Sequence, residues 1–173
     1  MKKIFKLSKV YTLLESGPVI LVSTALKGRN NVMPMSWHTM IDFNPPLVGC
    51  VIGEQSLTFK TLKTTKECVI NIPTVELAKK ALACGYVSGA KVDKFAKSGL
   101  TAKKGSLVKA PLIEECYASL ECKLADGGMA GKYNLFILKV VKAWVDTAVK
   151  NPKTFHHRDR DSFIVAGKAV TLP

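Results

Sequence analysis

Polar and aromatic side chains interrupt the sequence between two apolar runs, within residues 30–53. In order, they are Asn30, Asn31, Pro34, Ser36, Trp37, His38 and Thr39. Consecutive backbone N–H groups and hydroxyls in such a stretch can hydrogen bond to the polar edge of a flat ring, with an aromatic side chain packed beside it. The alternatives are a core strand with a half-buried tryptophan and a packed or surface histidine. The pattern indicates a binding segment or an ordinary strand.

A second group of residues has the chemistry of an anion site. Ser56 and Thr58 stand where a helix is expected to begin, and the free N–H groups of a helix start favour an anion. Ordinary N-capping by Ser56 is the alternative. The sequence KVDKF, residues 91–95, adds two lysines and a phenylalanine. It reads either as part of the anion site or as a solvated loop anchored by the phenylalanine.

Other chemistries find little support in the sequence. His156, His157, Asp159 and Asp161 are close together, but their spacing is not that of zinc ligands and is typical of a solvated turn. No cysteine or serine stands in a recognisable nucleophile motif. No Rossmann glycine fingerprint occurs between a strand and a helix. We therefore predict no metal site and assign no catalytic residue, although His38 is a weak candidate.

Composition limits the classes of protein further. The net charge is +13, from 26 Lys+Arg against 13 Asp+Glu, but the lysines are scattered and only 8% of residues are aromatic, which disfavours nucleic-acid binding and favours an acidic ligand or partner. The five cysteines form no CxxC motif and mostly lie in apolar runs, as in a reduced compartment. No run approaches the roughly 20 apolar residues of a membrane helix. We expect a soluble cytoplasmic protein.

Hydrophobic periodicity predicts one mostly β domain over residues 1–173. Strands are expected at 18–26, 32–41, 46–53, 67–73, 117–125, 133–145 and 162–171, and helices at 56–66 and 74–85. Residues 86–110 are expected to be loop with helical fragments. In 117–125 the alternation places Ser119, Glu121 and Lys123 on the polar face. The absence of regular strand–helix alternation predicts a Greek-key antiparallel barrel with a few helices.

Several long blocks follow one another in the chain. They are GPVILVSTALKGRNNVMPMSWHTMIDFNPPLVGCVIG, SLTFKTLKTTKECVINIP, VDKFAKSGL, APLIEECYASLECKL and TFHHRDRDSFIVAGK. In order and spacing they resemble the flavin reductase-like, FMN-binding split-barrel family, and the last block resembles its flavoredoxin-like branch. The resemblance implies the split-barrel fold and a homodimer with one FMN per subunit near the dimer interface.

The resemblance also implies the residues of a flavin site. The family segment that runs along the isoalloxazine ring and ribityl chain matches Asn31, Pro34, Ser36, Trp37, His38 and Thr39. The block that meets the ribityl phosphate at a helix start matches Ser56, Leu57 and Thr58. Lys94 matches a position near the phosphate or the neighbouring loop.

The expected function is that of an FMN-dependent oxidoreductase or electron carrier, with hydride or electron transfer through flavin N5. Residues 131–134 read GKYN where many flavin reductases carry GDH, whose histidine lies close to the nicotinamide or flavin. The electron donor is therefore open between NAD(P)H and an acidic electron-transfer protein. Two alternatives remain, a non-catalytic flavin- or haem-binding protein and, less favoured, a basic nucleic-acid-binding protein.

Overall fold

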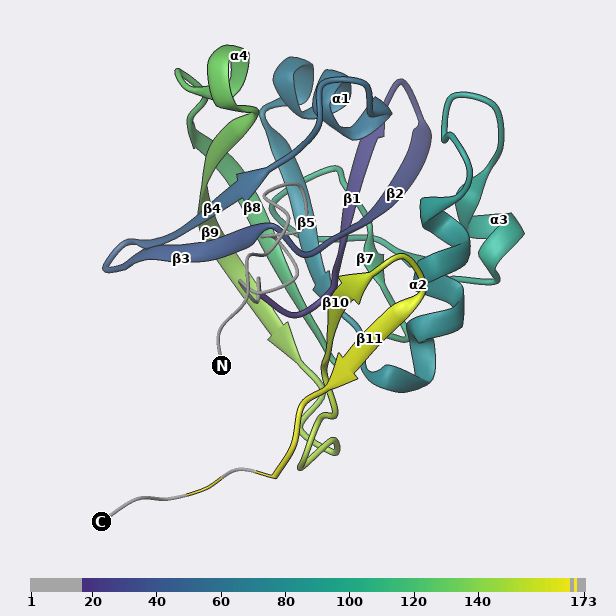
Figure 1. Ribbon diagram of the computed structural model, residues 1–173. Coiled ribbons are helices and arrows are strands. Elements are labelled where there is room, and N and C mark those ends of the chain that lie inside the picture. Colours follow the sequence, from purple (N-terminus) through teal and green to yellow (C-terminus); the bar gives the residue numbers. More distant parts are fainter. Residues whose placement is uncertain (1–16, 169, 171–173) are drawn as a thin grey trace, which may run out of the picture.

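The computed structural model describes residues 17–168 and 170, and it is dominated by β-strands (Figure 1). The strands are β1 (Ile20–Leu26), β2 (Arg29–Met35), β3 (His38–Phe43), β4 (Pro46–Val51), β5 (Glu67–Ile72), β6 (Ala102–Lys103), β7 (Leu112–Ile113), β8 (Ala118–Asp126), β9 (Leu135–Val145), β10 (Phe155–Asp159) and β11 (Ser162–Val165). The helices are α1 (Leu57–Thr65), α2 (Ala78–Gly85), α3 (Lys94–Ser98) and α4 (Ala130–Tyr133), with a 3₁₀ turn at Val75–Leu77.

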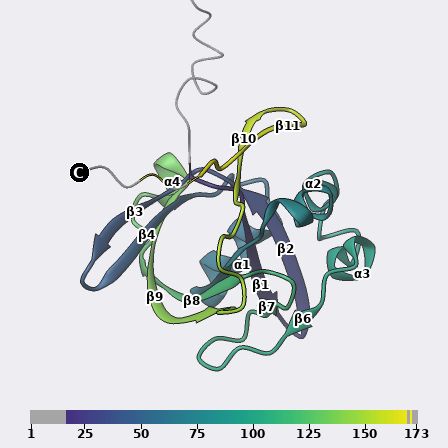
Figure 2. The same ribbon diagram turned by 90° about the horizontal axis from the view of Figure 1, so that it is seen from below.

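Seven strands form one antiparallel sheet in the order β2-β1-β5-β8-β9-β4-β3. Seen from below, the sheet curls round into a barrel (Figure 2). The barrel is not closed by hydrogen bonds, because β2 and β3 are the two edges of the sheet. The expected antiparallel barrel with a few helices is therefore present, and its split lies between the edge strands β2 and β3.

The two edge strands on either side of the split, β2 and β3, follow one another directly in the chain. β2 ends at Met35 and β3 begins at His38, so only Ser36 and Trp37 connect the two edge strands. The Trp37 carbonyl accepts a hydrogen bond of 2.9 Å from the N–H of Val51, which ties the connection to the end of β4. Because two residues can bridge only a short gap, the two open edges of the sheet lie close together at this end of the barrel.

Both faces of the sheet near β1 are buried, which explains why this strand is apolar at nearly every position. Ile20 and Val22 point into the barrel interior, whereas Val19 and Leu21 point into a second cluster outside it. The outer cluster also contains residues of α2, α3 and β10. Helix α1 covers one end of the interior, where Phe59 meets Phe136 edge-to-face at 5.1 Å.

The cysteines behave as small apolar residues. All five are buried and unpaired. Cys50, Cys68 and Cys122 lie in the barrel interior, and Cys84 and Cys116 lie in the outer cluster. The described residues include no helix that is long and apolar enough to cross a membrane.

Most predicted elements are present with small shifts, and three differ. The helix expected at 74–85 is a 3₁₀ turn followed by α2, and the Thr74 side chain makes no cap hydrogen bond. Residues 130–133 form the short helix α4, so the GKYN segment is not in a strand as expected. Of the final strand expected at 162–171, residues 162–165 form β11, and residues 169 and 171 lie outside the described residues. β11 pairs with β10, which was not predicted, because Arg160 turns the chain back with a positive φ.

Glu121 lies on the polar face of β8, as the alternation predicted, and this face is covered at Glu121. The side chain is fully buried, because the segment from Gly105 to Ala110 covers this face of the sheet. The carboxylate accepts hydrogen bonds from five groups, which are Ser106 N, Ser106 Oγ, Leu107 N, Val108 N and Trp144 Nε1. Burial alone would raise the pKa of Glu121, but these hydrogen bonds outweigh it and lower the pKa to about 2.

Glu121 is therefore expected to stabilise the fold in a pH-dependent way. Because its pKa is lowered from 4.5 to about 2 on folding, its contribution is complete above pH 4.5 and is lost as the pH falls toward 2. Glu121→Gln should reduce the free energy of unfolding at pH 7 by roughly 2 kcal/mol, the scale of a hydrogen bond to a charged group. Urea denaturation followed by circular dichroism at pH 7 and pH 3 measures this. The difference between variant and wild type should shrink at the lower pH.

The matched control is Glu114→Gln. Glu114 makes an exposed ion pair with Lys103, with N–O distance 2.9 Å, and such pairs contribute roughly 0–1 kcal/mol. Equal losses of stability in the two variants at pH 7 would contradict the role assigned to Glu121.

Candidate functional site

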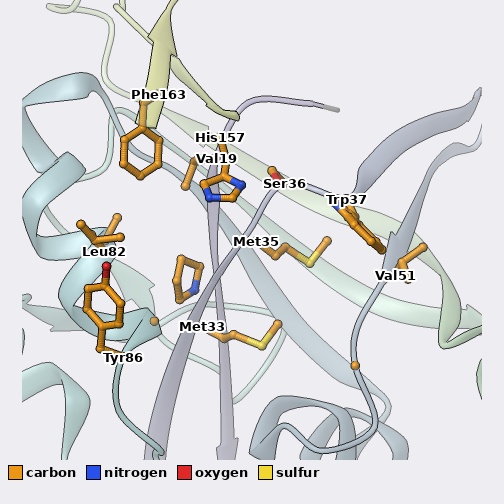
Figure 3. Close-up of a pocket in the computed structure, with 14 residues that line it drawn as sticks. Val19, Met33, Met35, Ser36, Trp37, Val51, Leu82, Tyr86, His157 and Phe163 are labelled. Carbon is orange, nitrogen blue, oxygen red and sulfur yellow. The ribbon is translucent and has the colours of Figure 1, made fainter. Parts of the chain in front are cut away.

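A pocket of about 460 Å³ opens where the barrel is split (Figure 3). Its lining comes from the residue before β1, the end of β2 with the β2–β3 connection, the end of β4 with the residues that follow it, helix α2 with Tyr86, and the hairpin β10–β11. The lining residues are Val19, Met33, Pro34, Met35, Ser36, Trp37, Val51, Gly53, Ala81, Leu82, Gly85, Tyr86, His157 and Phe163. Most of these side chains are apolar or aromatic, so the pocket suits a flat organic ring with a few polar edges.

The β2–β3 connection forms one wall of this pocket. Pro34 lies beside Gly85 of α2, where a Cβ atom would come within 3.3 Å of its ring. Ser36 is buried, whereas Trp37 is 56% exposed although it lines the pocket. A large aromatic side chain left half in solvent at a pocket mouth is available to a ligand or to another chain.

The predicted anion site lies next to this wall. The N–H of Ser56 donates to the carbonyl of Gly53, a pocket residue, at 3.0 Å, and α1 begins at the next residue, Leu57. Ser56 caps the helix by accepting a hydrogen bond of 3.0 Å from Phe59 N. The N–H groups of Leu57 and Thr58 therefore have no acceptor within the helix, and they lie at its positive end.

Asn31 connects the start of α1 to β2. Its Nδ2 donates to Thr58 Oγ1 at 2.9 Å, and the whole side chain is buried. Asn31 Oδ1 is also buried but has no hydrogen-bond partner among the described residues. Buried polar atoms are nearly always paired, so an unpaired one needs an explanation. The residues predicted from two separate blocks are thus in direct contact, and they leave one polar atom unsatisfied.

The loop after α2 packs against Asn31 and the start of α1. A Cβ atom at Gly89 would lie 1.9 Å from Asn31 Oδ1 and 3.3 Å from Leu57 Cδ2, so only glycine fits there. Arg29 Nη2 holds the loop by donating to the carbonyl of Ala90 at 3.3 Å. The loop backbone, the start of α1 and Asn31 therefore surround one small region.

The hairpin β10–β11 forms the wall opposite the β2–β3 connection. Phe155 is fully buried, and its carbonyl accepts a hydrogen bond of 2.7 Å from Val19 N. At the other end of the hairpin, the Tyr86 hydroxyl donates to Asp161 Oδ1. This hydrogen bond, which favours the protonated phenol, raises the pKa of Tyr86. The hairpin is thus fastened to the barrel and to α2, and it holds His157 and Phe163 at the pocket.

Three predicted site residues lie away from the pocket. His38 Nε2 is 2.7 Å from the Pro18 carbonyl, and burial lowers the pKa of this histidine. Thr39 is exposed on β3 and bonds only to the neighbouring Met40 carbonyl. Lys94 is buried, with Nζ 2.8 Å from the Cys84 carbonyl, and burial lowers its pKa. In this conformation, none of the three side chains lines the pocket.

The sequence analysis missed several pocket residues. They are Val19, Met33, Met35, Val51, Gly53, Ala81, Leu82, Gly85, Tyr86, His157 and Phe163. His157 was assigned to a solvated turn, because its neighbours in sequence are charged. The structure forms no metal-binding group from the described histidine, cysteine and acidic residues. The sequence offered little signal there, because residues 155–163 read FHHRDRDSF, with a phenylalanine only at each end of a polar and charged run.

Comparison with known proteins extends these observations. The family model for the flavin reductase like domain matches residues 14–163. The uncharacterised protein YddH of Escherichia coli is 31% identical, and the alignment covers 92% of each chain. An uncharacterised protein of Archaeoglobus fulgidus is 36% identical over 71% of this chain and 70% of its own.

Solved structures share the fold. An FMN-binding domain of a flavin reductase-like enzyme from Shewanella baltica superposes with a TM-score of 0.86 at 29% identity, covering 98% of this chain and 96% of that one. Flavoredoxin of Desulfovibrio vulgaris superposes with a TM-score of 0.87 at 23% identity, covering 99% and 97%, which is a likeness of fold. The split-barrel prediction is confirmed, and the chain belongs to the flavin reductase-like domain family.

Proposed function

We propose that this protein binds FMN in the pocket at the split of the barrel and acts as a flavin-dependent oxidoreductase or electron carrier. The observation that carries the proposal is the contact between an apolar pocket and a helix start beside a buried, unpaired polar atom, Asn31 Oδ1. FMN has the matching parts, which are a flat ring system, a polar chain and an anionic phosphate. The relative from Shewanella baltica, whose structure is described as an FMN-binding domain, supports the same proposal.

The ring end of FMN fits the large pocket. Methionine and aromatic side chains offer polarisable surfaces to a conjugated ring, and Met33, Met35 and Trp37 line one side. The backbone between Pro34 and Trp37 offers polar groups for the ring edge. In this proposal the β2–β3 connection is the edge-binding segment that the sequence indicated.

The phosphate end of FMN fits the start of α1. The N–H groups of Leu57 and Thr58 point outward from the positive end of a nine-residue helix. Asn31 and the backbone around Gly89 border the same region. A phosphate there receives N–H groups that the helix itself leaves unsatisfied.

Bound FMN would supply hydride transfer at N5 and single-electron transfer. The protein's contribution is to bind and orient the ring and to shape the local charge. With 26 Lys+Arg against 13 Asp+Glu, the chain carries more positive charge than its own carboxylates can neutralise. Positive charge favours a reduced, anionic flavin and attracts an acidic electron-transfer partner.

An absorption experiment tests the function directly. The purified protein, titrated with FMN, should develop the visible bands of a bound flavin. Anaerobic NADH and NADPH are then added in turn. Bleaching by one nucleotide would identify a reductase, and no bleaching would identify a carrier supplied by a protein donor. A protein that retains no FMN at any concentration would contradict the proposal.

The phosphate site leads to a sharper prediction. Asn31→Asp places a carboxylate of the same shape beside the start of α1, where it repels a phosphate and competes for the same N–H groups. FMN affinity should fall at least tenfold, equivalent to about 1.4 kcal/mol. Riboflavin, which lacks the phosphate, should keep its affinity. Isothermal titration calorimetry with both flavins measures the two dissociation constants.

Asn151→Asp is the control, because Asn151 is exposed and does not line the pocket, yet the substitution makes the same change in net charge. It should leave both affinities unchanged. An equal loss of affinity for FMN and riboflavin in Asn31→Asp would show that the variant disturbs the ring site instead, and the phosphate assignment would fail.

We also propose that the protein is a homodimer, with the hairpin β3–β4 at the interface. The hairpin projects from the barrel (Figure 1). It exposes Met40, Ile41 and Phe43, and Trp37 is exposed directly before it. Phe43 is 87% exposed, and a protruding apolar hairpin of this kind is typical of an association surface. Because Trp37 also lines the pocket, a second chain seated on this hairpin adjoins the flavin.

Phe43→Asp should convert the dimer into a monomer, because it places a charge in the middle of the proposed interface. Sedimentation equilibrium of wild type and variant at equal concentration measures the change in mass. Val149→Asp changes another partly exposed apolar residue outside the hairpin and should leave the mass unaltered. A wild-type protein that sediments as a monomer, or a Phe43→Asp variant that remains dimeric, would rule out this interface.

A further inference from the structure

His157 is an ionisable side chain in a pocket that is otherwise almost without them. Among the described residues that line the pocket, Tyr86 and His157 are the two with ionisable side chains. None of these described lining residues is a carboxylate. Figure 3 shows the imidazole of His157 at the pocket beside Phe163. An ionisable side chain that exchanges a proton with a ligand in this pocket is therefore one of these two, and solvent is the other source of protons.

Tyr86 is unsuited to carry that proton. Its hydroxyl already donates to Asp161, and this hydrogen bond raises the pKa of the phenol. The residue is also needed to fasten α2 to the turn of the hairpin. Tyr86 therefore keeps its proton through the physiological range, and His157 is the group that remains.

The position of the His157 ring is fixed by its own hairpin. Its Nε2 lies 2.9 Å from the carbonyl of Arg160, and a carbonyl can only accept a hydrogen bond. Nε2 therefore carries a hydrogen in both charge states. The ring also packs edge-to-face on Phe163, with 5.6 Å between ring centres. Nδ1 is thus the nitrogen that changes protonation, and it has no hydrogen-bond partner among the described residues.

The hairpin that presents His157 is itself well anchored. Phe155 packs on Phe163 at 5.4 Å, and the N–H of Ala166 donates to the Thr154 carbonyl at 2.8 Å. Strand alternation turns His157 toward the pocket and the neighbouring His156 toward the opposite face of β10. A ring held in this way is presented to the pocket by rigid structure and not by a mobile tail.

Resting on the function proposed above, we infer that His157 stores the second proton of a two-electron flavin reduction and delivers it to the electron acceptor. Reduction of FMN by two electrons and one proton gives the anionic form with hydrogen at N5. The negative charge that appears in the pocket draws a further proton from solvent onto His157 Nδ1. When a quinone then takes a hydride from N5 and this proton from His157, it becomes a hydroquinone, and oxidised flavin and neutral His157 are restored.

Other charged groups near His157 do not account for such an uptake. On its own hairpin these are Arg158, Asp159, Arg160 and Asp161, and α2 contributes Tyr86 at its end. The arginines remain charged at all relevant pH values. Asp161 accepts the Tyr86 hydroxyl, and Asp159 lies at the register shift of the hairpin and does not line the pocket. Of these groups, His157 is the one whose ring lines the pocket with a nitrogen, Nδ1, that has no hydrogen-bond partner among the described residues.

The test counts protons per electron. Spectroelectrochemical titration of FMN-loaded wild type, repeated between pH 5 and pH 9, gives the midpoint potential as a function of pH. Where His157 is coupled to the flavin, the slope should correspond to two protons per two electrons. In His157→Gln the slope should halve over the same range, to one proton per two electrons. The glutamine amide can still donate to the Arg160 carbonyl, so the hairpin is preserved.

His156→Gln is the matched control, because it removes a histidine from the same strand but from its other face. It should keep the wild-type slope. A His157→Gln variant that also keeps the wild-type slope, or a wild type that takes up one proton per two electrons throughout, would overturn the role of His157. Failure of the wild type to bind FMN would instead overturn the proposed function.

A measurement on the wild type removes any dependence on the folding of the variant. NMR titration of the His157 ring, with oxidised and then with reduced flavin bound, should show a higher pKa in the reduced state. An identical pKa in the two states would overturn the inference. In addition, anaerobic reoxidation of the reduced protein by 1,4-benzoquinone should slow at least tenfold in His157→Gln and lose its pH dependence, and an unchanged rate would count against proton delivery.

Discussion

The two-residue connection between β2 and β3 is the constraint on which the rest of the structure depends. These strands are neighbours in sequence but opposite edges of the sheet, so Ser36 and Trp37 force the two edges together at one end. Open sheet edges carry unpaired N–H and C=O groups that must be covered or used. Here they converge on a pocket. The split in the barrel, the position of the pocket and the exposure of Trp37 are therefore consequences of one short segment.

The contrast between two buried polar side chains shows which of them serves the fold. Glu121 receives hydrogen bonds from five groups, and its charge is fully accommodated. Asn31 is equally inaccessible but keeps one oxygen without a partner among the described residues. Thr24 Oγ1 is also buried without a partner among the described residues, but Asn31 is the one that contacts the start of α1. The difference supports a structural role for Glu121 and a ligand-binding role for the region around Asn31.

Local patterns predicted the fold well where they reflect burial. The apolar run at β1 and the Ser56 cap of α1 follow directly from composition and spacing, and both are present. The burial of Glu121 was not predicted, because strand alternation separates the two faces of a sheet and cannot reveal that a distant loop covers one of them. The groups that donate to its carboxylate lie 13 to 23 residues away in sequence. Contacts of this kind depend on topology, which the periodicity of a single strand does not contain.

The candidate site was predictable only in part, for the same reason. Pro34, Ser36 and Trp37 line the pocket, and Asn31 contacts Thr58 as their separate blocks suggested. Tyr86, His157 and Phe163 come from segments that look like loop and solvated turn, and only the packing of the hairpin onto α2 brings them to the pocket.

Tyr86, His157 and Phe163 change the chemistry that the pocket can perform. The β2–β3 wall alone offers an apolar surface with backbone polar groups, which can hold a ring but cannot exchange a proton. The hairpin adds one imidazole whose tautomer is fixed by the Arg160 carbonyl. The many lysines of this basic chain cannot substitute for it, because no described lysine lines the pocket. Long-range charge can attract a partner and favour a reduced anion, whereas proton exchange requires a titrating group at the pocket itself.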